Sequence, residues 1–187
     1  MNFEIRDFEE DLKTGNRAEE LILSKFKSVV QPLVERVMYN DGVISKNLQK
    51  AGVDAFISKK ETGFDVKSRD FRYYQFQDIL LETVSIREYN IPGWLFITNA
   101  VVYVWWNKRQ TKFVDGYILF LQNIRNWFES KPENYRRIIA HSGKGNKTWS
   151  TESIIVPITD FPLGCIYKIN KKEFQDSTQT DFKTFFD

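Results

Sequence analysis

Cysteine, histidine and long apolar runs are scarce in this chain. The single cysteine, Cys165, cannot form an internal disulfide, which suits a reducing compartment. The single histidine, His141, excludes zinc sites built from several histidines. No segment approaches the roughly 20 apolar residues of a membrane helix, and the acidic, polar N-terminus is unlike a signal peptide. We therefore expect a cytoplasmic protein with no membrane-spanning segment.

A large excess of charge, internal repeats and interdomain linkers are missing as well. The formal net charge of +2 excludes a uniformly basic surface that coats nucleic acid, so any basic patch must be local. The length of 187 residues fits one domain. We expect a single domain over residues 1–170, followed by a polar C-terminal tail or arm over residues 171–187.

Hydrophobic periodicity predicts both helices and strands. Apolar residues recur at helical spacing over residues 17–30 and again over residues 117–128. We expect residues 71–77 to form an aromatic loop over the site described below, residues 91–93 a turn, and residues 141–146 a glycine-rich basic loop. This order predicts an α/β or α+β domain with one central mixed β-sheet. The expected strands span residues 33–39, 52–57, 64–67, 79–86, 101–106, 135–140, 153–159 and 165–169.

Residues 52–70 place charged side chains inside two short strands that flank a polar turn. Asp65 and Lys67 are two residues apart, so strand alternation directs them to one face. If the strands pair as a hairpin, Asp54 comes near Asp65. Neighbouring carboxylates repel one another unless a cation lies between them, and a divalent metal ion with oxygen ligands is the natural occupant. The simpler alternative is two ordinary acids, one in a turn and one on the surface, held by a salt bridge to Lys67.

Three short motifs follow one another in the first part of the chain: Gly15-x-Arg17-x-Glu19, Gly52-Val53-Asp54 and Asp65-x-Lys67. Their order resembles the PD-(D/E)XK nuclease superfamily, in which a helix supplies a glutamate and two successive strands supply the other residues. Residues 15–19 are most similar to archaeal Holliday-junction resolvases, whereas residues 65–100 look more like phage and viral nucleases. The resemblance covers residues 15–106, a bit under half of the chain. Two departures are Val53, where the pattern has proline, and an aspartate as the second acid.

The resemblance implies a restriction-endonuclease-like α/β core, in which helices flank the central mixed β-sheet. It also implies a Mg²⁺-dependent deoxyribonuclease that hydrolyses phosphodiester bonds, with Mn²⁺ as a substitute and junction or branched DNA as one candidate substrate. Asp54, Asp65 and the Val66 carbonyl would hold the metal, and Glu19 would act through a bound water or a second metal. Lys67 would either activate the water or neutralise developing charge, and nearby carboxylates favour its charged form.

Two glutamates have a structural interpretation as well as a role in the site. Glu19 could instead close a capping box with Asn16 at the start of the predicted helix. Glu82 lies in the middle of a predicted strand on the same face as Leu80 and Val84. This position makes Glu82 a further candidate acid of the metal site, and an exposed strand residue is the alternative.

Basic and aromatic residues near the hairpin are candidates for contacts with nucleic acid. The basic residues would bind backbone phosphates, and the tyrosines would stack on splayed bases, unless their loop packs on the core instead. The candidates are Lys59, Lys60, Arg69, Arg72, Tyr73 and Tyr74.

We expect DNA as the partner and a homodimer as the assembly, because two strands must be cut. If the chain is of phage or viral origin, the expected location is the host cytoplasm. Two other functions remain open, an RNA endonuclease with the same site and a catalytically inert nucleic-acid-binding module of the same fold. An exonuclease or a defence nuclease could also use this site.

Overall fold

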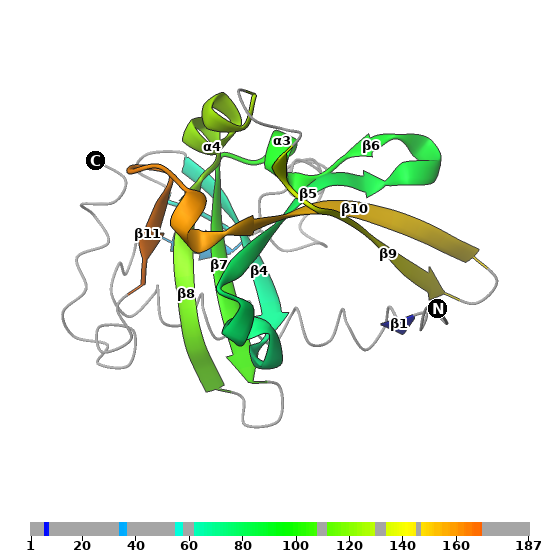
Figure 1. Ribbon diagram of the computed structural model, residues 1–187, viewed down its shortest axis with the longest axis horizontal. Helices are drawn as coiled ribbons and strands as arrows, with labels where there is room; N and C mark the ends of the chain where they lie inside the picture. The colour runs from blue at the N-terminus through cyan, green and yellow to red at the C-terminus, as the bar shows by residue number, and fades with distance from the viewer. Residues whose placement is uncertain are drawn as a thin grey trace.

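The computed structural model describes residues 6–7, 34–36, 55–57, 62–107, 112–129, 134–144 and 147–169 (Figure 1). Within these ranges the chain is a mixed α/β structure with two β-sheets, many strands and few, short helices. The helix predicted for residues 17–30 and the tail of residues 171–187 lie outside the described residues. None of the helices within these ranges is long and apolar enough to cross a lipid bilayer.

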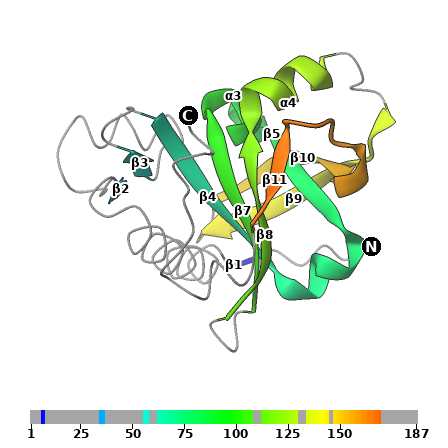
Figure 2. The same cartoon turned by 90° about the vertical axis from the view of Figure 1, so that its left-hand side faces the viewer.

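The first sheet has six strands in the order β11-β8-β7-β4-β3-β2. Strands β4 and β7 are parallel, and all other neighbours are antiparallel, so this sheet is mixed. Figure 2 shows its longer strands side by side. The strands are β2 (Val34–Arg36), β3 (Ala55–Ile57), β4 (Thr62–Asp70), β7 (Ala100–Asn107), β8 (Lys112–Phe120) and β11 (Ile166–Lys168).

The second sheet has five strands in the order β1-β9-β10-β5-β6, of which only the pair of β1 and β9 is parallel. In Figure 1 the hairpin of β9 and β10 extends away from the six-stranded sheet. The strands are β1 (Arg6–Asp7), β5 (Asp78–Ile86), β6 (Ile91–Pro92), β9 (Arg137–Lys144) and β10 (Lys147–Pro157).

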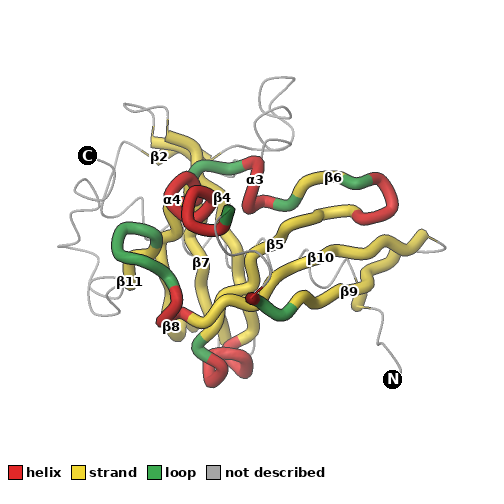
Figure 3. Tube along the Cα trace, turned by 45° about the horizontal axis from the view of Figure 1, so that its top comes forward, coloured by secondary structure: helices red, strands yellow, loops and turns green. Residues whose placement is uncertain are grey.

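Short helices connect the strands. The 3-10 helices are η1 (Phe71–Phe76), η2 (Arg87–Tyr89) and η4 (Ile158–Asp160). The α-helices are α3 (Trp94–Ile97) and α4 (Leu121–Phe128), which lie at the same end of the sheets (Figure 3).

The crossover between β4 and β7 brings the two sheets together. Parallel neighbours cannot be joined by a tight turn, so the chain must cross from one end of β4 to the start of β7. This crossover spans residues 71–99 and contains β5, a central strand of the other sheet. As a result, the start of β5 lies beside the end of β4, where Arg69 contacts Asp78.

The hydrophobic core lies between the two sheets. Ile79 and Leu81 of β5 and Ile154 of β10 are fully buried from one side. Trp105 and Leu119 of the six-stranded sheet are fully buried from the other. Helix α4 closes one end of this core through Leu121, Ile124 and Phe128, which recur at helical spacing.

The expectation of one central sheet is wrong, because the late strands form a second sheet with β5. The helix predicted for residues 117–128 is also wrong in its first turn. Residues up to Phe120 belong to β8, and the helix begins at Leu121. Tyr117 and Leu119 are buried in the core, while Ile118 is buried on the opposite face of the strand. A strand buried on both faces is a continuous apolar run without alternation, so it mimics the start of an apolar helix.

Most other predicted strands are confirmed within one or a few residues, including the strands expected over residues 79–86 and 101–106. Three predicted loops are partly wrong. Residues 71–76 form a 3-10 helix, residues 91–92 form a short edge strand, and β9 continues to Lys144. In the last case, pairing with β10 supplies the cross-strand hydrogen bonds that the glycine-rich sequence alone did not indicate.

Candidate functional site

The hairpin predicted for residues 52–70 is confirmed. Strand β3 pairs with β4 in an antiparallel register that joins Ala55 to Phe64 and Ile57 to Thr62. Phe64 is the residue that precedes Asp65, and its side chain is 1% exposed. The predicted site residues Glu19, Asp54, Lys59 and Lys60 lie outside the described residues.

Asp65 and Lys67 form an ion pair on one face of β4. The Lys67 Nζ atom lies 2.7 Å from Asp65 Oδ2, which confirms that the two side chains share a face. The Asp65 side chain is 2% exposed, whereas that of Lys67 is 38% exposed. A buried carboxylate therefore meets an ammonium group that reaches solvent. The simpler interpretation of the sequence, a salt bridge to Lys67, describes this contact as well.

Glu82 lies on β5, in the other sheet. Strand β5 alternates buried and partly buried residues, so Glu82 points away from the face that carries Ile79 and Leu81. Burial raises the pKa of the Glu82 carboxyl, while the charge of Lys67 lowers it. The Trp94 N–H, 3.4 Å from Glu82 Oε1, also lowers the pKa. Glu82 is therefore near enough to Lys67 for the lysine charge to act on its carboxyl.

Gly93 allows the chain to pass close to Glu82. A Cβ atom at Gly93 would lie 2.2 Å from the Glu82 carbonyl oxygen and 2.5 Å from its carbonyl carbon. The Gly93 N–H donates to the Thr83 carbonyl at 2.9 Å, which ties the start of α3 to β5. The sequence indicated only a turn here, although the glycine between Pro92 and Trp94 was the signal for a close backbone approach.

Two of the basic residues predicted to bind phosphate form ion pairs within the protein. The Arg69 Nη1 atom contacts the Asp78 carboxylate and donates to the Asp78 carbonyl at 3.1 Å. The Arg69 guanidinium also lies 5.0 Å from the centre of the Tyr73 ring. Arg72 binds Asp70 through Nε at 3.0 Å, and its side chain is 71% exposed. Binding of nucleic acid by either arginine stays a prediction.

Tyr74 packs on the core, which was the alternative to base stacking. The Tyr74 ring contacts the edge of Trp105 with a centroid distance of 5.5 Å. Its hydroxyl donates to Asp115 Oδ2 at 2.7 Å, and this hydrogen bond raises the pKa of Tyr74. Lys168 also contacts Asp115 Oδ2, at 3.0 Å. Both ends of the Tyr74 side chain therefore have structural partners.

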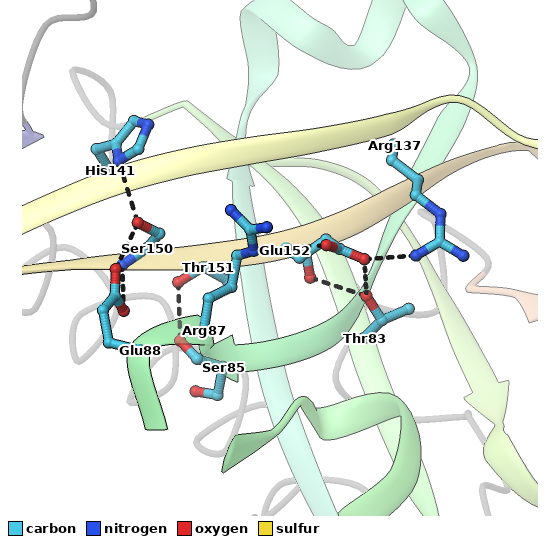
Figure 4. A network of polar contacts seen from close by, with 9 residues as sticks. All are labelled: Thr83, Ser85, Arg87, Glu88, Arg137, His141, Ser150, Thr151 and Glu152. Carbon is cyan, nitrogen blue, oxygen red and sulfur yellow. Dashed lines mark hydrogen bonds and ion pairs between the residues drawn. The ribbon is translucent and has the colours of Figure 1, made fainter. Parts of the chain in front are cut away.

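His141 and Ser150 come together, but not as a catalytic triad. The His141 Nδ1 atom lies 3.2 Å from Ser150 Oγ (Figure 4). The Ser150 hydroxyl donates to Glu88 Oε1 at 2.7 Å, and the Ser150 N–H donates to Glu88 Oε2 at 3.0 Å. The serine proton therefore points to the glutamate, whereas a serine nucleophile must give its proton to the histidine.

The structure describes only some of the predicted metal ligands. Within the part of the chain that the structure describes, no group of three or more histidine, cysteine, aspartate or glutamate side chains could hold a metal ion. Two of the predicted acids, Glu19 and Asp54, lie outside this part. Comparisons with protein-family models and with curated proteins find no match for this chain.

Proposed function

We propose that this protein is a metal-dependent deoxyribonuclease with a restriction-endonuclease-like core, as the PD-(D/E)XK motif implies. The observation that carries the proposal is the ion pair of Asp65 and Lys67, in which a carboxylate that is 2% exposed meets an ammonium group that is 38% exposed. Burial of a carboxylate, a cation and a second carboxyl inside β-strands lowers the stability of the fold. Such an arrangement therefore indicates a functional site.

The arrangement of the strands supports the proposal. The motif requires an acid on one strand and an acid–x–lysine sequence on the next, and β3 and β4 are adjacent antiparallel strands, of which β4 carries Asp65 and Lys67. Asp54 directly precedes Ala55 in the sequence, and Ala55 pairs with the residue before Asp65. The crossover then supplies Glu82, which the sequence offered as a further acid.

The donor atoms fit a hard divalent cation. Mg²⁺ takes oxygen ligands and needs only one or two protein carboxylates, which Asp65 and Glu82 provide, together with the Val66 carbonyl. Asp54 and Glu19 are further ligands in this proposal, and Mn²⁺ is a substitute. When bound, the metal supplies Lewis-acid stabilisation of the charge that develops on the phosphate.

The residues of the chain bind and orient the phosphate. Lys67 is anchored by Asp65 yet 38% exposed, so its ammonium group can reach a phosphate oxygen. Asp65 holds the ammonium group and keeps it charged beside the negative substrate. Charge neutralisation at the phosphate is therefore the role that we propose for Lys67, rather than removal of a proton from water.

Cleavage assays test this proposal. The purified protein is incubated with branched DNA, linear duplex, single strands and RNA, with Mg²⁺, Mn²⁺ or a chelator. We expect metal-dependent cutting of DNA that Asp65→Asn and Lys67→Gln abolish and that Asp160→Asn, a change at an exposed acid of η4, retains.

Each outcome assigns a function. Absence of cutting of every substrate with either metal would overturn the enzyme proposal. Binding without cutting would assign the inert nucleic-acid-binding module, and cutting of RNA alone would assign the RNA endonuclease. Light scattering of the eluted protein measures whether the active species is the proposed homodimer.

A further inference from the structure

One carboxylate on the second sheet is shared by two arginines. The Arg137 Nη1 atom lies 2.7 Å from Glu152 Oε1, and the Arg87 Nε atom lies 3.6 Å from Glu152 Oε2. Figure 4 shows Glu152 between the two arginine side chains. The Glu152 side chain is 14% exposed, whereas those of Arg137 and Arg87 are 58% and 43% exposed. The acid is therefore sheltered, and the two cations face solvent.

Thr83 fixes this carboxylate in place. Its hydroxyl lies 3.3 Å from the Glu152 carbonyl oxygen and 3.4 Å from Glu152 Oε1. The backbone of Glu152 sits at a register shift between β10 and β5, next to Ser153. Such irregularities redirect side chains out of the regular alternation. Glu152 is thus a fixed anchor that orients the guanidinium groups of Arg87 and Arg137.

The charges of the segments that carry these residues do not balance. Arg136, directly before β9, and Lys147, at the first position of β10, are also exposed. The other acid nearby, Glu88, already accepts two hydrogen bonds from Ser150. Among the described side chains of η2, β9, β10 and residues 134–136, four lysines and arginines face two acids. These segments together therefore carry an excess of positive charge, although the chain as a whole is nearly neutral.

Stability alone does not account for the second arginine. An exposed ion pair contributes about 0–1 kcal/mol, and one arginine already neutralises Glu152. Each guanidinium group is planar and carries five N–H donors, and both side chains are exposed. Such a set of donors matches the oxygens of a phosphate group, and its orientation by Glu152 lowers the entropy lost on binding.

We propose that Arg87 and Arg137, here called the hairpin arginines, bind the phosphate backbone of the nucleic acid that the protein acts on. This inference rests on the proposed function, because it assigns part of the substrate to this surface. It adds these arginines to the predicted set of phosphate contacts, in which Arg69 is 13% exposed and pairs with Asp78.

The spacing along β5 fits such a role. Arg87 follows Glu82 by five residues, which corresponds to at most about 17 Å of extended strand. One strand of a DNA duplex advances roughly 3.4 Å per base step, so this length is about five steps. The hairpin arginines would therefore hold the backbone several nucleotides from the phosphate at Lys67.

The test measures binding separately from cutting. Fluorescence anisotropy of a labelled DNA duplex is recorded with the full chain in chelator, over a range of salt concentrations. The variants are Arg87→Gln, Arg137→Gln and the double change. The matched control is Lys168→Gln, because Lys168 is also 58% exposed and also pairs with a largely buried carboxylate, that of Asp115.

We expect the double variant to bind DNA about tenfold more weakly at moderate salt. The slope of log K against the logarithm of salt concentration should be smaller in magnitude by roughly two, one for each lost phosphate contact. Lys168→Gln should bind as the original protein does. The charge-preserving pair Arg87→Lys and Arg137→Lys should keep most of the salt slope, because the slope counts charges. Circular dichroism verifies that each variant is folded, and the single changes serve if the double variant is not.

Two results would overturn the inference: unchanged affinity of the folded arginine variants, or an equal loss in Lys168→Gln. Cutting by the original protein is measured in parallel with Mg²⁺. If the protein cuts DNA while the arginine variants bind normally, the inference fails and the proposed function stands. If the variants lose binding and no substrate is cut, the surface binds nucleic acid and the nuclease proposal fails.

Discussion

The Lys67 ammonium group lies 2.7 Å from Asp65 Oδ2, so the proposed site contains a cation of its own. Transfer of a carboxylate into a protein interior costs several kcal/mol unless a partner compensates it, and the Asp65 side chain is 2% exposed. Lys67 supplies that compensation without a metal ion. A metal ion that binds Asp65 must therefore share the carboxylate with Lys67 or displace it.

Replacement of Lys67 should separate metal binding from activity. In Lys67→Met the competing cation is gone, so we expect Mn²⁺ to bind about tenfold more tightly while cutting is lost. Isothermal titration with Mn²⁺ measures the affinity, and Lys168→Met is the control for loss of a surface lysine. Mn²⁺ affinity that is unchanged or weaker in Lys67→Met would show that Lys67 and the metal do not compete for Asp65.

Gly93→Ala should disturb the site through the backbone of Glu82. The added Cβ atom would lie 2.2 Å from the Glu82 carbonyl oxygen, so β5 or α3 must shift. We expect a loss of about 1–3 kcal/mol in the free energy of unfolding, together with reduced cutting.

Gly164→Ala is the control for this prediction. Gly164 has a φ of +82°, but its Cβ position is open, with the nearest atom, Asn123 Nδ2, at 3.8 Å. This change should lower stability by roughly 1 kcal/mol through backbone strain and leave cutting intact. Normal stability and activity in Gly93→Ala would contradict the close approach of α3 to Glu82.

Tyr74→Phe should affect stability and not binding. The change removes the hydrogen bond to Asp115, which lies 2.7 Å from the Tyr74 hydroxyl. Hydrogen bonds to charged groups contribute about 1.5–3 kcal/mol, so urea unfolding should show a loss of that order. Tyr89→Phe, at a tyrosine that is 78% exposed, should be neutral. Unchanged stability of Tyr74→Phe would show that the hydrogen bond to Asp115 does not stabilise the fold.

The contact between Glu88 and Ser150 predicts a dependence of stability on pH. The Ser150 hydroxyl and N–H lower the pKa of the Glu88 carboxyl below its ordinary value. The unfolded chain therefore binds the Glu88 proton more readily than the folded protein. Glu88 stabilises the fold above the ordinary glutamate pKa of about 4.3, and this contribution is lost as pH falls through the lower folded pKa.

Glu88→Gln checks this sign. The variant should be less stable than the original protein at pH 7, and the difference should shrink as the pH falls below about 4. Urea unfolding at a series of pH values provides the comparison, with Glu129→Gln at the exposed end of α4 as the control. A constant difference across the series would show that the ionised carboxylate of Glu88 does not stabilise the fold.

Local patterns were enough to predict the hairpin of β3 and β4 and the shared face of Asp65 and Lys67. Both follow from the two-residue period of a strand, which depends only on backbone geometry. The same period placed Glu82 on one face with Leu80 and Val84. The boundary between β8 and α4 was missed, because Tyr117, Ile118 and Leu119 are all buried and leave no alternation to detect.

The sequence by itself thus determined which residues share a strand face and the acid–x–lysine motif that makes Asp65 and Lys67 a candidate site. Only the tertiary structure decided which distant residues join them. The path of β5 places Glu82 where the charge of Lys67 acts on it, and it pairs Asp78 with Arg69. The pairing of β9, β10 and β5 places Arg87 and Arg137 beside Glu152. Such partnerships depend on how whole strands pack, because contacts between residues far apart in the sequence are not encoded by any local period.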